Sequence, residues 1–304
     1  KTKGETADEV AGAAQALRST MVRLPHVPRT THHVPLVDTC GTGGGATTTF
    51  NISTTAAFVV AGAGIPVAKH GNRSFTSRSG SADVLEALGI PIDQTPAEAA
   101  ETLAQTGLAF LFAPTYHPAM RHAAPVRKEL KTTTIFNLLG PLANPAGVTR
   151  QVIGVHDVGR GPLVAEALAR LGAEHALVVH AEVGMDEISP SGVTRIWEVR
   201  GPLTAHRSPL TEWTLDPGQY DLAHDDLDAL KGGEPAENAE RLERLLIDPH
   251  LDPEGTAAVL LNAAAAIYVS GAVETFAAAV EAAREALASG KAAGVLASLR
   301  GRRG

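Results

Sequence analysis

The chain of 304 residues is long enough for about two domains, and its 44% hydrophobic and 19% charged residues are ordinary for a globular protein. A net charge of -7 argues against a broad nucleic-acid-binding surface, which requires clustered lysine and arginine. The apolar runs are too short for a membrane span of about 20 residues, and the single cysteine, Cys40, excludes an internal disulfide framework. We therefore expect a cytoplasmic protein with no membrane partner. The chain begins at Lys1 without an initiator methionine, so we expect its start to be missing.

Predicted helices and strands alternate along most of the chain. Thr6 and Glu9 form a capping box for a helix over 5–21, after which prolines make a stiff linker. Strands are predicted at 36–38, 66–69, 108–113, 152–155 and 176–180, and helices begin near residues 53, 81, 95 and 163. Ser81 is expected to cap its helix, and Gly89 to follow that helix's end.

The regular alternation stops between residues 114 and 147, where prolines separate short helical pieces. Two more strands, near 195–199 and 212–215, precede alanine-rich helices that start at Glu237. Strands that alternate with helices predict an α/β fold around a mostly parallel central sheet.

Residues 39–82 contain neither aspartate nor glutamate, and their only full charges are Lys69, Arg73 and Arg78. The same segment is rich in glycine, serine and threonine. Backbone N–H groups, hydroxyls and cations are all hydrogen-bond donors to an anion. The segment therefore predicts a pocket for a highly anionic ligand, with phosphate as the first candidate. A lone lysine usually lies on the surface, but Lys69 ends a strand and is expected to face the crevice beyond the sheet.

The glycine-rich stretch 41–46 lies between a predicted strand and a predicted helix and fits the dinucleotide fingerprint G-x-G-x-x-G/A. That fold also needs an acid about 20 residues further on, where this chain has Lys69-His70, and a Walker loop would need Lys-Ser/Thr after the glycines. A tight turn without a ligand is the alternative, and four glycines in five residues make it less favoured. Asn51, Ser53 and Thr54 are either plain N-caps or donors beside an anion-binding helix N-terminus.

Asp186-Glu187 and Arg127 also have two interpretations. Adjacent acids in a loop are usually only solvated, but this pair follows a buried strand, and Mg²⁺ prefers a few carboxylate oxygens together with substrate phosphates. Arg127 is favoured, from the sequence alone, as a surface arginine on a helix.

Several motifs in chain order resemble anthranilate phosphoribosyltransferase, from about residue 4 to near the C-terminus. They are Gly41-Thr42-Gly43-Gly44, Phe50-Asn51-Ile52-Ser53-Thr54, Lys69-His70-Gly71-Asn72-Arg73, Gly80-Ser81-Ala82-Asp83-Val84-Leu85-Glu86, His117-Pro118-Ala119-Met120-Arg121-His122, Pro125-Val126-Arg127-Lys128-Glu129-Leu130, Phe136-Asn137-Leu138-Leu139-Gly140-Pro141-Leu142 and Gly184-Met185-Asp186-Glu187-Ile188-Ser189-Pro190.

The resemblance implies a fold of the nucleoside phosphorylase/phosphoribosyltransferase type. A small helical domain (1–34 plus about 114–147) would adjoin a larger α/β domain (35–113 plus 148–304), with the substrates between them. It also implies a homodimer, to which helices that precede residue 1 in the family contribute.

The implied activity is that of a Mg²⁺-dependent glycosyltransferase (pentosyltransferase) of tryptophan biosynthesis. It transfers phosphoribosyl from 5-phosphoribosyl-1-diphosphate (PRPP) to anthranilate, giving N-(5-phosphoribosyl)anthranilate and diphosphate. The implied PRPP-binding residues are Gly41, Gly44, Gly45, Thr49, Asn51, Ser53, Thr54, Lys69, Asn72, Arg73, Ser77 and Ser81. Gly41, Asn72, His117 and Arg127 would bind anthranilate, and Ser53, Asp186 and Glu187 would bind Mg²⁺. No dedicated catalytic acid or base is expected.

The chain departs from the family pattern at Gly45-Ala46, where most relatives have Asp-Gly. Without that carboxylate we expect catalysis to persist, with less inhibition by excess Mg²⁺. The alternatives are a pyrimidine-nucleoside phosphorylase-like enzyme and a non-catalytic homologue that binds nucleic acid. Lys69–Arg73 and Arg127 favour the transferase over the first, and the net charge of -7 speaks against the second.

Overall fold

A computed structural model describes residues 3–25, 35–43, 48–74, 78–130, 134–201 and 209–301, without the side chains of Ala124, Arg127 and Lys128. The strands are β1 (Val37–Gly41), β2 (Val67–Gly71), β3 (Leu108–Phe112), β4 (Arg150–Gly154), β5 (His175–Ala181), β6 (Thr194–Arg200) and β7 (Leu210–Leu215). The α-helices are α1 (Ala7–Thr20), α2 (Ile52–Gly62), α3 (Ser81–Ala87), α4 (Pro96–Thr106), α5 (Ala113–Tyr116), α6 (Ala124–Leu130), α7 (Phe136–Leu142), α8 (Arg160–Arg170), α9 (Pro235–Ile247), α10 (Pro253–Ser270), α11 (Phe276–Ala288) and α12 (Lys291–Arg300). Short 3₁₀ helices are η1 (Pro118–His122), η2 (Pro217–Tyr220), η3 (Asp228–Leu230) and η4 (Pro249–Leu251).

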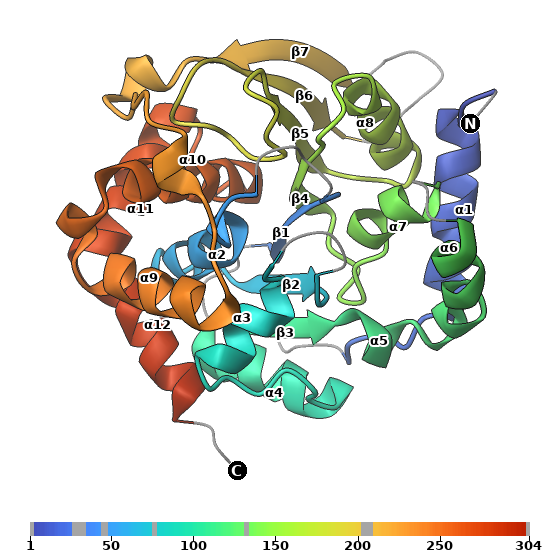
Figure 1. Ribbon diagram of the computed structural model, residues 1–304. Coiled ribbons are helices and arrows are strands. Elements are labelled where there is room, and N and C mark those ends of the chain that lie inside the picture. The colour runs from blue at the N-terminus through green and yellow to red at the C-terminus, as the bar shows by residue number, and fades with distance from the viewer. Residues whose placement is uncertain are drawn as a thin grey trace.

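The strands form a seven-stranded sheet in the order β3-β2-β1-β4-β5-β6-β7. β1 to β5 pair in parallel, whereas β6 is antiparallel to both β5 and β7. Helices cover the sheet on two sides, with α2 and α9–α12 on one side and α1, α7 and α8 on the other (Figure 1). The predicted α/β fold with a mostly parallel sheet is therefore confirmed.

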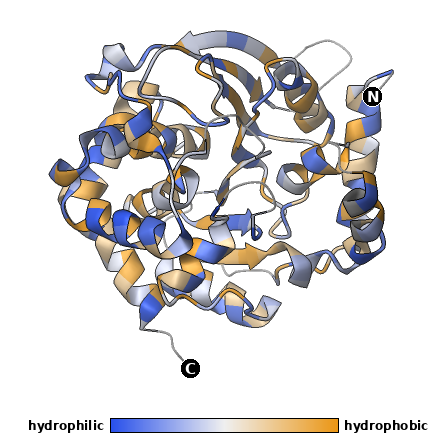
Figure 2. Ribbon diagram, in the orientation of Figure 1, coloured by the Kyte–Doolittle hydropathy of each residue, from blue (hydrophilic) through white to orange (hydrophobic). Residues whose placement is uncertain are grey.

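The central strands are hydrophobic on both faces because helices cover both. β5 is buried along its whole length, and the largest apolar cluster joins α2 and α10 to the sheet. Hydrophilic residues gather on outer helices such as α9 (Figure 2). Of the helices in the described ranges, none combines the length and the apolar character that crossing a membrane requires. The parallel pairing brings the carboxyl ends of β1, β2, β4 and β5 to one edge, which is where α/β proteins bind ligands.

α1 and the short helices of residues 113–142 lie together beside the sheet (Figure 1). Arg18 on α1 donates a hydrogen bond from Nε to the carbonyl of Leu142 over 2.7 Å, and the N–H of Val22 donates to the carbonyl of Tyr116 over 2.8 Å. The capping box of Thr6 and Glu9 is present. The division into a small helical and a larger α/β domain stays a prediction.

The predicted cap of α3 is wrong by one residue. Gly80 is the N-cap and Ser81 the first helical residue, whose Oγ donates to the carbonyl of Asn72 over 3.3 Å. The side chain that contacts the N-cap is that of Asp83, three residues after Gly80, and it accepts a hydrogen bond from the N–H of Gly80 over 2.8 Å. Gly89 follows the helix with a φ of 78°, as predicted.

Candidate active site

A cavity of about 970 Å³ lies at the carboxyl ends of β1, β2 and β4. Twelve of the predicted site residues line it, namely Gly41, Thr49, Asn51, Ser53, Thr54, Lys69, Asn72, Arg73, Ser81, His117, Asp186 and Glu187. Gly44, Gly45 and Ser77 lie outside the described residues. Arg127 belongs to α6, and its side chain is not described.

The acidic pair reaches this cavity because its loop, which follows β5, crosses the ends of β1 and β4. Gly41 and Gly154 are register partners there, and a Cβ on Gly154 would overlap the backbone of Asp186. The N–H of Gly43 donates to Asp186 Oδ2 over 2.9 Å. The glycines thus let the acidic loop lie directly against the glycine-rich turn.

Glu187 is held in a half-buried position beside Asp186. Thr49 Oγ1 donates to Glu187 Oε2 over 2.8 Å, and the backbone of Ser53 also donates to this carboxylate. Burial, followed by the charge of Asp186, raises the pKa of Glu187 to about 8, although Lys69 and the hydrogen bonds oppose this. A cation at the pair would relieve both effects, so the prediction of a merely solvated pair does not suit these residues.

Lys69 is buried, so the surface-lysine alternative is wrong. Its Nζ donates to the carbonyl of Thr39 over 2.6 Å and to Ser53 Oγ over 3.2 Å. Burial lowers the pKa of Lys69, and the carboxylate of Asp38 works against that shift. Asp38, which the sequence did not single out, is itself buried and accepts from the N–H of His70 over 3.2 Å and from Asn144 Nδ2 over 2.8 Å.

Asn51 occupies the N-cap position of α2, but its side chain makes no capping hydrogen bond. Its Nδ2 donates to the carbonyl of Ser79 over 3.2 Å, and its Oδ1 accepts from Ser79 Oγ over 3.2 Å and from Asn238 Nδ2 over 3.0 Å. Asn51 therefore ties the start of α2 to the end of the loop before α3, with α9 contributing Asn238. The plain N-cap interpretation is wrong for this residue.

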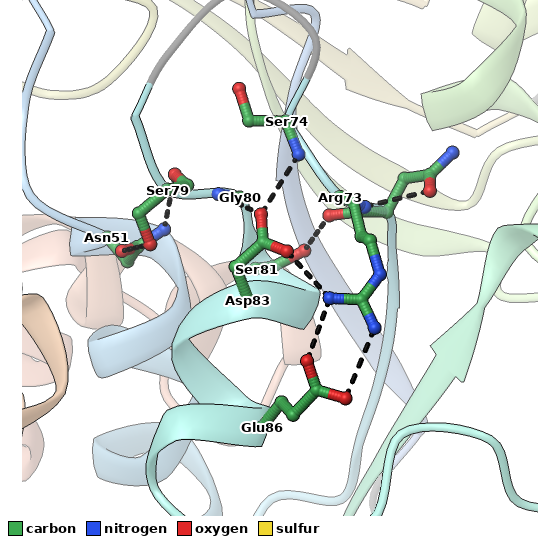
Figure 3. Close-up of polar contacts among 9 residues, drawn as sticks. Asn51, Arg73, Ser74, Ser79, Gly80, Ser81, Asp83 and Glu86 are labelled. Atoms are coloured by element: carbon green, nitrogen blue, oxygen red, sulfur yellow. Dashed lines mark hydrogen bonds and ion pairs between the residues drawn. The ribbon is translucent and has the colours of Figure 1, made fainter. Parts of the chain in front are cut away.

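Arg73 lines the cavity, yet its guanidinium pairs with two carboxylates of α3 (Figure 3). Arg73 NH1 lies 2.9 Å from Asp83 Oδ1 and 2.8 Å from Glu86 Oε2. Asp83 Oδ2 also accepts from the N–H groups of Ser74, over 3.2 Å, and of Gly80, over 2.8 Å. One carboxylate thus holds both ends of the segment 74–80. The acids responsible begin directly after the acid-free segment 39–82.

Two histidines form a neutral aromatic wall of the cavity. The rings of His70 and His117 lie 5.0 Å apart at 55°. Burial lowers the pKa of His70 to about 3 and also lowers that of His117. Because His70 Nδ1 lies 3.1 Å from the carbonyl of Gly140 and must donate to it, Nε2 is left as an acceptor, and it has no partner among the described residues.

The donor set around Asp186 and Glu187 suits a hard divalent cation. Two carboxylates and the hydroxyl of Ser53 are oxygen ligands of the kind that Mg²⁺ takes. Nowhere in the described part of the chain do three or more His, Cys, Asp or Glu side chains gather as a metal cluster. The remaining ligands would have to come from substrate phosphates and water, which is the usual arrangement for Mg²⁺.

Comparisons with known proteins agree on one family. Residues 33–293 match the model of the glycosyl transferase family, a/b domain. An anthranilate phosphoribosyltransferase of Nitrosomonas europaea is 46% identical over 292 residues, which is 96% of this chain and 82% of the relative. The crystal structure of the Thermus thermophilus enzyme of that name matches 98% of this chain and 87% of its own, with a TM-score of 0.87 and 44% identity. The Saccharomyces cerevisiae enzyme, solved in complex with PRPP and Mg, matches 97% of this chain and 80% of its own, with a TM-score of 0.84 and 29% identity.

Proposed function

This chain belongs to the anthranilate phosphoribosyltransferase family, and we propose that the cavity at the carboxyl ends of β1, β2 and β4 is its active site. The enzyme transfers the 5-phosphoribosyl group of PRPP to anthranilate in tryptophan biosynthesis. The observation that carries the proposal is that an acid-free wall rich in hydrogen-bond donors and a half-buried acidic pair, Asp186 and Glu187, line the same cavity. A diphosphate needs the first and its metal ion needs the second.

We propose that PRPP lies along the wall made by the glycine-rich turn, the start of α2 and the end of β2. Lys69 and the hydroxyls of Ser53 and Thr54 are donors to phosphate, with Gly41, Thr49, Asn51, Asn72 and Ser81 beside them. Gly44, Gly45 and Ser77 remain predicted contacts. Arg73 also remains one, and to reach PRPP its guanidinium would have to leave Asp83 and Glu86.

Asp186 and Glu187, with Ser53, would hold Mg²⁺ against the diphosphate. When bound, the ion would offset the negative charge that grows on the leaving diphosphate. Its predicted ligands already lie next to each other, since the backbone of Ser53 donates to the Glu187 carboxylate.

Anthranilate is proposed to bind beside His117, with Asn72 and Gly41 next to it and Arg127 pairing with its carboxylate. Its amine is neutral at pH 7, so the nitrogen lone pair can form the new bond to C1 of the ribose as the bond from C1 to diphosphate breaks. The amine then releases one proton to water. Because the nucleophile needs no activation, positioning and electrostatics supply the catalysis, which is consistent with the neutral state of His70 and His117.

Diphosphate release from PRPP with anthranilate, compared with phosphorolysis of thymidine, tests the activity. We expect release that requires both anthranilate and Mg²⁺, and a preference for thymidine would refute the proposal. The double variant Asp186→Asn, Glu187→Gln should need far more Mg²⁺ for turnover while keeping the wild-type melting temperature. We also propose a cytoplasmic homodimer without a nucleic-acid partner, which sedimentation and a salt-dependent DNA gel shift would test.

A further inference from the structure

Asn262 is an amide in the middle of a helix that is largely buried. α10 runs from Pro253 to Ser270 and is composed largely of alanine, leucine and valine, with Asn262 only 6% exposed. Asparagine is a poor helix former in such a position, and an unpaired buried amide is costly. Its presence therefore calls for specific partners.

Those partners lie 74 residues away along the chain, directly after the acidic pair. Asn262 Nδ2 donates to the carbonyl of Ile188 over 2.8 Å, and Asn262 Oδ1 accepts from the N–H of Ile188 over 3.1 Å. Nδ2 also donates to the carbonyl of Ala258, one helical turn earlier, over 2.9 Å. One side chain thus satisfies both backbone groups of a loop residue, as a neighbouring strand would.

The loop is held from its other side as well. Gly41 and Gly154 leave room for Asp186 against the ends of β1 and β4, and the side chains of Met185 and Ile188 are buried. Apolar burial fixes where the loop lies, but it is not directional. The paired hydrogen bonds to Ile188 fix the orientation of the peptide groups at residue 188, and hence the direction in which Glu187 enters the cavity.

We propose that Asn262 is a positioning residue that orients Asp186 and Glu187 for the divalent cation that accompanies PRPP. The inference rests on the proposed function, because it takes the acidic pair as the metal ligands. Partners that hold ligating carboxylates in place typically change metal affinity by about 10- to 100-fold when they are lost. A side chain that only stabilised α10 would leave that affinity unchanged.

The test uses Asn262→Ser, which is small enough to fit and too short to reach Ile188, and Asn262→Leu, which fills the space without polar groups. Leu287→Ala is the matched control, because it weakens the apolar core from another helix, α11, and removes no polar group. Mn²⁺ binding in the presence of PRPP, followed by electron paramagnetic resonance, should weaken about tenfold in both Asn262 variants. It should stay at the wild-type level in Leu287→Ala, and the anthranilate KM should change less than twofold in all three.

Hydrogen exchange at the Ile188 amide gives a second readout that needs neither metal nor substrate. Exchange should be faster in Asn262→Ser than in wild type at matched stability, since the amide loses its acceptor. Wild-type Mn²⁺ affinity in a folded Asn262→Ser protein, or equal loss in Leu287→Ala, would overturn the inference. The inference is also wrong if the wild-type protein binds no Mn²⁺ in the presence of PRPP. Turnover of anthranilate by the wild type is a separate test, which addresses the proposed function alone.

Discussion

Replacing Gly154 by alanine tests how closely the acidic loop must approach the sheet. The Asp186 carbonyl would have to move by about 1.5 Å to bring the new Cβ contact out to 3.0 Å, below which real Cβ atoms are essentially never found. The obstacle is backbone, so no side-chain rotation relieves it. A misplacement of about 1 Å in an active site can cost on the order of 100-fold in rate, or about 2.7 kcal/mol in the barrier. We expect a loss of kcat of that size and a destabilisation of about 1–3 kcal/mol from overpacking.

Gly41→Ala should destabilise the protein less, because its new Cβ meets the end of the Asp186 side chain, which can rotate, but it should still raise the Mg²⁺ requirement because that carboxylate is a proposed ligand. Gly294→Ala on α12 is the control, since nothing lies within 4 Å of its added methyl group, and alanine there should leave kcat unchanged and stabilise the helix by about 0.5–1 kcal/mol. Steady-state kinetics over a Mg²⁺ titration, with a melting curve for each variant, are the measurements. A Gly154→Ala enzyme with wild-type kcat and Mg²⁺ dependence would refute the placement of the acidic loop.

Arg127→Ala should raise the anthranilate KM by roughly 10- to 100-fold with little change in the PRPP KM, because a bidentate charged contact to a carboxylate contributes about 1.5–3 kcal/mol; an unchanged anthranilate KM would contradict its role. Asp83→Ala should raise the PRPP KM several-fold, since the N–H groups of Ser74 and Gly80, at the two ends of segment 74–80, both lose their shared acceptor, Asp83 Oδ2; an unchanged PRPP KM would show that this anchor does not matter for binding. His70 is expected to make the free energy of unfolding decrease as the pH is lowered from about 6.5 to 3. Its pKa of about 3 in the folded protein lies below that in the unfolded chain, so over this range the unfolded chain binds the extra proton. Denaturant titrations at pH 7.5 and 5 should show this slope in the wild type and a smaller one in His70→Gln. Gly45→Asp should restore inhibition by excess Mg²⁺, and identical Mg²⁺ profiles would exclude an electrostatic role for position 45.

Local patterns in the sequence were sufficient for the fold class and for much of the site. Alternating strands and helices predict the parallel sheet, because each element needs only its own hydrophobic period and its own caps. The glycine-rich turn, the acid-free segment and the acidic pair were each visible as short runs, and parallel strands carry their carboxyl ends to the same edge. The sequence therefore predicts that Lys69 and Asp186 face the same crevice, and both line the cavity.

The tertiary structure decided which partners those residues have. Asn51 looked like a helix cap, but Asn238, 187 residues away, and Ser79 take its side chain. Arg73 looked like a phosphate ligand, but Asp83 and Glu86 hold its guanidinium in this conformation. Side chains bond whichever groups folding brings within about 3 Å, and sequence spacing does not encode that proximity.

The same reason explains the residues that sequence patterns did not single out. Asp38 is one acid near the start of β1, and Asn262 is one polar residue in the alanine-rich helix α10. Neither is part of a local sequence motif, because the hydrogen-bond partner of each lies far away along the chain. Asp38 pairs with Asn144, and Asn262 pairs with Ile188. Burial makes their hydrogen bonds obligatory, and burial exists only once the sheet and α10 have packed.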